Sequence, residues 1–118
     1  MGIDAVIRFE STVDEPDLEW FHGGEVEKIA DDYYDTDGGK PTHEVDLGGH
    51  RYYGKGYERG PWPTISAILL VLLMSKDVKK VWYGGDCNDW IGAVDIDWLN
   101  EMNKYYVEYG HRPYRRDR

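Results

Sequence analysis

Residues 61–85 read PWPTISAILLVLLMSKDVKKVWYGG, and this stretch decides the fold. Residues 64–76 are apolar nearly all round a helix, which predicts a buried helix at the centre of the core. The apolar run 65–74 is interrupted only by Ser66 and lasts ten residues, half of what a bilayer crossing needs. Residues 79–83 favour β-structure and stop at a Gly-Gly pair, which predicts a strand directly after the helix.

Three further strands are expected before this stretch. Residues 3–10 alternate between apolar and polar side chains, the pattern of a half-buried strand. Residues 43–47 and 50–53 flank Gly48-Gly49 as the two arms of a hairpin would. The sequence therefore predicts strands near 3–10, 43–47, 50–53 and 79–83.

Helices are expected on both sides of the central stretch. Asp14 precedes Glu15-Pro16 as a helix N-cap would, and apolar residues from 26 onward recur at helical spacing, so we predict amphipathic helices near 15–34. Asp95 is placed to cap a last helix near 95–109, which Gly110 would end. Its apolar stripe consists of Trp98, Leu99, Met102, Tyr106 and Tyr109.

These elements predict one α+β domain over residues 1–118, because 118 residues support a single core. We expect a small mixed sheet packed against the buried helix and the amphipathic helices, with a basic, flexible tail at 111–118. Strand 50–53, the helix and strand 79–83 would form a β-α-β unit. If both strands lie in one sheet, they are parallel and their C-terminal ends share an edge.

Negative charge is concentrated in the first part of the chain. The formal net charge is −9, and residues 1–50 contain 14 acidic and three basic residues, whereas residues 51–118 contain nine acidic and 11 basic ones. Direct nucleic-acid binding is therefore not expected, because it depends on basic surfaces. The acidic field could instead steer a basic protein surface into contact, or simply keep the protein soluble. The candidate partner-binding residues are Asp31, Asp32, Asp35 and Asp37.

The reactive residue types form no recognisable metal or cofactor motif. Cys87 is the single cysteine, and no cationic leader with an apolar stretch opens the chain, so we expect a cytoplasmic, reducing setting and no membrane partner. The four histidines lack the close spacing of zinc ligands, and the acidic turns lack the ligand pattern of a calcium loop. No cofactor and no metal are expected.

One loop edge could bind a small ligand. The β-α-β order would bring the loops 54–60 and 84–89 together, ahead of a helix N-terminus that favours anions. The candidate ligand-binding residues are Lys55, Tyr57, Arg59, Asp86 and Asp89. The glycine spacing matches neither a P-loop nor a dinucleotide fingerprint, so these residues could equally brace two connecting loops.

The residues favour binding over catalysis, since no nucleophile or acid-base motif frames Cys87 or the serines. We expect a non-enzymatic acidic module that occludes or inhibits a basic protein, a profile similar in general character to phage or mobile-element inhibitors and immunity proteins. The alternative is capture of a small anionic ligand such as a nucleotide at the 54–60 and 84–89 edge, or a small enzyme acting there. Homodimerisation is a further hypothesis, through aromatic anchors near the C-terminal end. These are Tyr105, Tyr106, Tyr109 and Tyr114.

Overall fold

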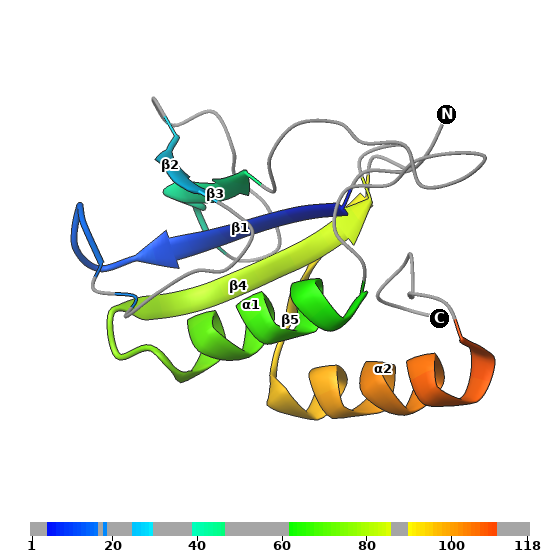
Figure 1. Ribbon diagram of the computed structural model, residues 1–118. Coiled ribbons are helices and arrows are strands. Elements are labelled where there is room, and N and C mark those ends of the chain that lie inside the picture. The colour runs from blue at the N-terminus through cyan, green and yellow to red at the C-terminus, as the bar shows by residue number, and fades with distance from the viewer. Residues whose placement is uncertain are drawn as a thin grey trace.

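A computed structural model describes residues 5–16, 18, 25–29, 39–46, 62–85 and 90–110, which form a five-stranded sheet and two helices (Figure 1). The strands are β1 (Ala5–Ser11), β2 (Glu25–Lys28), β3 (His43–Asp46), β4 (Val78–Gly85) and β5 (Trp90–Val94). The helices are α1 (Trp62–Met74) and α2 (Ile96–Tyr109). The predicted α+β class is confirmed, and five predicted elements appear with shifts of a few residues: β1, β3, β4 and the helices α1 and α2.

The strands lie in the order β2-β3-β1-β4-β5, and each neighbouring pair is antiparallel. The longest ladder joins β1 to β4, from the pair Ala5↔Gly85 to the pair Ser11↔Val78, with an irregularity after Glu10. Strand β1 is therefore the middle of the sheet. The expected mixed pairing is wrong for the described strands, because β3 and β4 run parallel to each other but β1 lies between them.

Both helices cover the same face of the sheet (Figure 1). Alternate residues of the central strands, such as Ile7, Phe9 and Val81, point to that face and are almost fully buried. Tyr83 contacts both helices, with its ring centroid 5.8 Å from that of Trp62 in α1 and 5.6 Å from that of Trp98 in α2. The core therefore lies between the sheet and the two-helix layer.

The opposite face of the sheet is mostly charged but contains one buried aromatic residue. Arg8 pairs with Glu44 at 3.6 Å and Lys79 with Glu10 at 3.7 Å. Trp82 lies on this face and is 0% exposed. Gly39 comes so close that a Cβ there would lie 3.1 Å from the Trp82 ring. A side chain at position 39 would displace this indole, which explains the glycine.

Helix α2 confirms the predicted end signals. The Asp95 carboxylate accepts a hydrogen bond of 2.8 Å from the Trp98 backbone N–H, and Gly110 closes the helix with φ of 80°. Leu99 is buried, and Trp98, Met102 and Tyr106 pack against the core as the stripe predicts. Tyr109 does not, because it is 58% exposed.

The predicted helical region near 15–34 is wrong at residues 25–28, which form strand β2. Each of its four residues pairs with one of β3, from Glu25↔Asp46 to Lys28↔His43. A four-residue segment holds little helical preference of its own, so pairing with a neighbouring strand decides its conformation.

Two other expectations need comment. Strand β5 was not anticipated, although it completes a hairpin with β4. The expected strand 50–53 and the tail 111–118 lie outside the described residues.

Helix α1 is buried on one side only, although its sequence is apolar nearly all round. Ile65, Leu69 and Leu72 are 0% exposed, whereas Leu70 is 47% exposed. The reason is that the sheet and α2 contact adjacent sides of α1 and leave its outer side to solvent. Within the described part of the chain, neither helix is long and apolar enough to cross a membrane.

Candidate functional site

The residues predicted to form the anion-binding edge and the acidic steering patch fall outside the described part of the chain. This applies to Lys55, Tyr57, Arg59, Asp86 and Asp89, and to Asp31, Asp32, Asp35 and Asp37. Strand β4 extends through Gly84 and Gly85, the first two residues of the second predicted loop, 84–89. The proposed small-anion site therefore stays a prediction.

Three of the four candidate self-association tyrosines lie on α2, and Tyr114 is outside the described residues. Tyr106 packs against the core and so has a structural role. The rings of Tyr105 and Tyr109 lie 4.7 Å apart. Tyr109 leaves more than half of its surface exposed.

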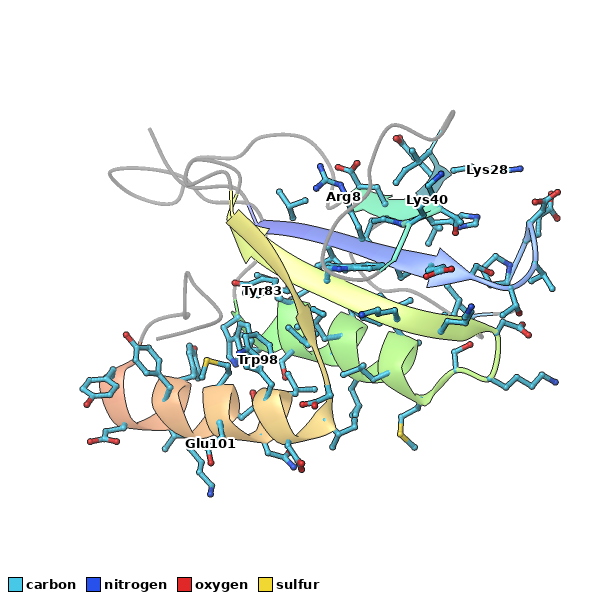
Figure 2. All side chains as sticks on the ribbon, turned by 180° about the vertical axis from the view of Figure 1, so that it is seen from behind. Arg8, Lys28, Lys40, Tyr83, Trp98 and Glu101 are labelled. Atoms are coloured by element: carbon cyan, nitrogen blue, oxygen red, sulfur yellow. The ribbon has the colours of Figure 1, made fainter. Side chains whose placement is uncertain are left out.

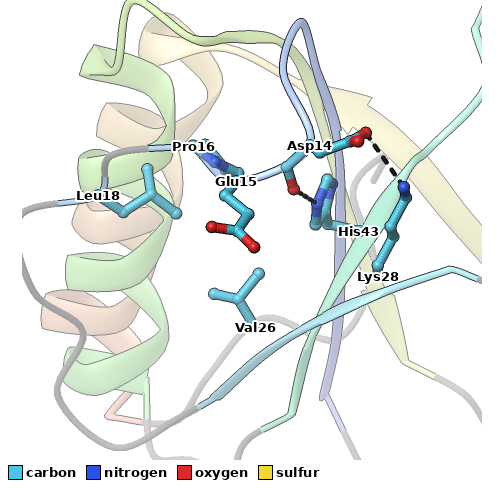
Figure 3. Close-up of a pocket in the computed structure, with 7 residues that line it drawn as sticks. All are labelled: Asp14, Glu15, Pro16, Leu18, Val26, Lys28 and His43. Atoms are coloured by element: carbon cyan, nitrogen blue, oxygen red, sulfur yellow. Dashed lines mark hydrogen bonds and ion pairs between the residues drawn. The ribbon is translucent and has the colours of Figure 1, made fainter.

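The structure contains a pocket of about 560 Å³ at the β2–β3 end of the sheet, on the face that carries the helices (Figure 3). Strands β2 and β3 form one wall, and the chain that leaves β1 forms the other. Pro16, Leu18 and Val26 make the apolar part, and Leu18 and Val26 also pack against the core. The polar lining residues are Asp14, Glu15, Lys28 and His43.

His43 is fixed in place by contacts on every side. It is 3% exposed and stacks on Phe9 with a centroid distance of 5.1 Å. Its Nε2 lies 2.9 Å from the carbonyl oxygen of Asp14, which can only accept, so Nε2 carries a proton. Its Nδ1 lies 2.6 Å from Thr42 Oγ1, and that hydroxyl also accepts from the Ser11 backbone N–H at 2.9 Å. The imidazole therefore ties β3 to the 14–16 segment and has no ring nitrogen left for a ligand.

The charged groups lie nearer to solvent. Lys28 Nζ donates to Asp14 Oδ1 at 3.1 Å, between side chains that are 59% and 83% exposed (Figure 3). An ion pair this exposed contributes about 0–1 kcal/mol, so an incoming charged group can replace it at little cost. Glu15 is exposed and makes no hydrogen bond or ion pair with any residue that the structure describes.

This arrangement suits a cationic side chain. A lysine or arginine can lay its hydrocarbon stem along Leu18 and Val26 while its charged head meets the carboxylates of Asp14 and Glu15. The described residues contain no group of three or more potential metal ligands.

The sequence does not predict this pocket. Its pattern predicts Asp14 and Glu15 at the start of a helix, and Val26 and Lys28 within one. The available signal was the alternation in residues 25–28, where Val26 and Lys28 share one face of a strand and Glu25 and Glu27 the other. His43 was assigned to the correct strand but not to a pocket.

Comparison with known proteins adds no relative: no protein-family model, no curated protein and no solved structure matches this chain.

Proposed function

We propose that this protein is a non-catalytic acidic binding module that occludes a basic surface of a partner protein and thereby inhibits it. The observation that carries the proposal is the pocket, whose lining combines the exposed acidic residues Asp14 and Glu15 with the apolar side chains of Leu18 and Val26. Figure 3 shows the Asp14 carboxylate turned toward Lys28, so Glu15 supplies the carboxylate that is unpaired among the described residues. A basic side chain of a partner matches both parts of this lining.

The charge distribution supports the same proposal at longer range. All the lining residues of the pocket lie within residues 1–50, which contain 14 acidic and three basic residues. A field of one sign raises the rate at which oppositely charged surfaces meet, and salt weakens it. A basic cleft that handles nucleic acid is a surface of the required sign, and an acidic protein seated in it would exclude the nucleic acid.

The partner can be identified and the proposal tested in sequence. Immobilised full-length protein retains partners from an extract of the native source, and mass spectrometry identifies them. Association rates with the purified partner are then measured for the wild type, for the Asp14→Lys/Glu15→Lys variant and for the Asp14→Asn/Glu15→Gln variant. We expect the Lys variant to associate at least tenfold more slowly near 20 mM salt, and the neutral variant to lie between it and the wild type.

The matched control is Lys76→Gln, which changes one exposed charge after α1, away from the pocket lining. It should leave the rate within about twofold of the wild type. An acidic partner, or association rates that neither salt nor the pocket substitutions change, would contradict the proposal.

A further inference from the structure

The outer side of α1 exposes an uninterrupted row of apolar side chains. The 13 residues of this helix include no charged residue. Pro63, Ala67, Leu70 and Met74 are all exposed, and their spacing of four, three and four residues places them on one side of the helix. Leu70 is 47% and Met74 71% exposed. A solvent-facing helix side normally carries polar residues, so this row needs an explanation.

Two exposed apolar side chains of α2 lie on the side of that helix that meets α1. Asn103 Oδ1 accepts from Trp62 Nε1 at 2.7 Å and from Ser66 Oγ at 3.0 Å, which fixes the sides on which the two helices meet. Ile96 and Val107 are seven residues before and four after Asn103, and so lie on the same side of α2. They are 36% and 83% exposed. We define the outer stripe as Pro63, Ala67, Leu70, Met74, Ile96 and Val107.

Acidic residues follow the outer stripe on α2. The side of α2 turned away from the sheet carries three exposed acidic residues, Asp97, Glu101 and Glu108. Lys104, the one basic residue of the helix, lies on the same side. Figure 2 shows Glu101 pointing away from the sheet and from the contact between Tyr83 and Trp98. The outer stripe is therefore an apolar surface with an acidic border.

We infer that the outer stripe binds an amphipathic, basic helical segment of a partner protein, with apolar side chains on the stripe and lysines or arginines against Asp97, Glu101 and Glu108. This inference rests on the proposed function, because it takes the partner to be basic. Charge complementarity selects a basic segment, and helices that present apolar residues at such spacing commonly bind in this way. A stripe of six side chains falls well short of the roughly 20–30 residues a side of a stable protein interface, which argues against a second copy as the occupant.

The test uses three synthetic helical peptides of about 14 residues, or four turns. The first has a leucine face and a lysine face, the second replaces its leucines with serine, and the third replaces its lysines with glutamate. Anisotropy of the labelled peptides gives the affinity, and amide shifts of the ¹⁵N-labelled full-length protein locate the contact. We expect the Leu/Lys peptide to bind at least tenfold more tightly than the other two and to shift amides of α1 and α2.

Two variants distinguish binding at the outer stripe from nonspecific hydrophobic binding of the peptide elsewhere on the protein. Leu70→Ser should weaken the Leu/Lys peptide at least tenfold. Val13→Ser is the matched control, since Val13 is 44% exposed and lies outside the outer stripe. It should change the affinity less than twofold.

Each other result has a distinct meaning. Equal binding of the Leu/Lys and Ser/Lys peptides, with no effect of Leu70→Ser, would overturn the role of the stripe and leave the proposed acidic function standing. Equal binding of the Leu/Lys and Leu/Glu peptides would show that the acidic residues of α2 do not select a basic segment. It would overturn this inference, whereas the proposed function would still be decided by the Asp14 and Glu15 variants. A dimer that Leu70→Ser dissociates would show that a second copy covers the stripe, and would overturn the inference.

Discussion

At the scale of single residues, Asn103 joins the two helices through one oxygen atom. Its Oδ1 accepts from Trp62 Nε1 and Ser66 Oγ, and Trp62 is 2% exposed. We predict that Asn103→Ala lowers the free energy of unfolding by about 1–2 kcal/mol, because it leaves a buried indole N–H without an acceptor. The higher helix propensity of alanine offsets about 0.5 kcal/mol of this loss. Urea unfolding followed by circular dichroism measures the change.

Ser66→Ala is the control for Asn103. It removes one donor but leaves Asn103 Oδ1 bonded to Trp62, so we expect a loss of less than about 1 kcal/mol. A larger effect from Ser66→Ala than from Asn103→Ala would show that the serine hydroxyl, and not the indole, needs this oxygen.

His43 gives a second residue-scale prediction. Because the Asp14 carbonyl can only accept from Nε2, the neutral ring should be the Nε2–H tautomer, with Nδ1 left to accept from the Thr42 hydroxyl. Long-range ¹H–¹⁵N correlation spectra distinguish the two nitrogens directly. Thr42→Val should lower the free energy of unfolding by about 1–3 kcal/mol, since it removes the acceptor of the Ser11 N–H as well. A fast tautomer average in the wild type would contradict the fixed arrangement.

At the scale of elements, α1 offers a matched pair of neighbouring leucines. Leu69 is 0% and Leu70 47% exposed. We predict that Leu69→Asp unfolds the protein, because it removes core packing worth about 2–5 kcal/mol and buries a charge without a partner. Leu72→Asp should do the same, since Leu72 is equally buried. Leu70→Asp should cost about 1 kcal/mol or less, mainly through helix propensity.

Circular dichroism and urea melts compare these three variants at one temperature. A native spectrum for Leu69→Asp would remove α1 from the core. Because Leu70 is 47% exposed, we expect Leu70→Asp to stay folded. If it unfolds, the outer side of α1 is covered in solution.

Strand β1 and helix α2 are predicted correctly because each has a distinct sequence pattern. Strand β1 alternates between apolar and polar residues from Ile7 to Glu10, and α2 has both an Asp95 cap and a Gly110 end. Strand β2 has only four residues, so the helical spacing that starts at Val26 competes with an alternation too short to decide between them. Strand β5 contains Gly92 and Ala93, which carry little β-preference, and its pairing with β4 supplies what its composition lacks.

The site was harder to anticipate than the fold. The pocket joins residues 14–16 and Leu18 to Val26, Lys28 and His43 across the end of the sheet, and this contact exists only once β2 pairs with β3. An error over one short strand therefore hid the whole pocket. The sequence did indicate the acidic character of this part of the chain, because the net charge of a segment can be counted without knowing how the segment folds.

At the scale of the whole molecule, the acidic excess should have opposite effects on stability and on binding. A net charge of −9, with the excess in residues 1–50, repels itself in the compact state and attracts a basic partner. We predict that neutralising Asp31, Asp32, Asp35 and Asp37 to Asn raises the melting temperature by roughly 3–6 °C at low salt, the equivalent of about 1 kcal/mol for a chain of this size. The same variant should associate more slowly with the basic partner.

Salt provides the control for this last prediction. Raising ionic strength from about 10 mM to about 150 mM shortens the Debye length from about 30 Å to about 8 Å, so it should stabilise the wild type and narrow its difference from the neutralised variant. Differential scanning calorimetry at the two salt concentrations gives the melting temperatures, and sucrose at equal osmolarity shows whether the effect depends on charge. If the neutralised variant melts below the wild type at low salt, these aspartates make specific stabilising contacts. Their negative charge would then belong to the fold, and the steering role would have to come from Asp14, Glu15 and the acidic residues of α2.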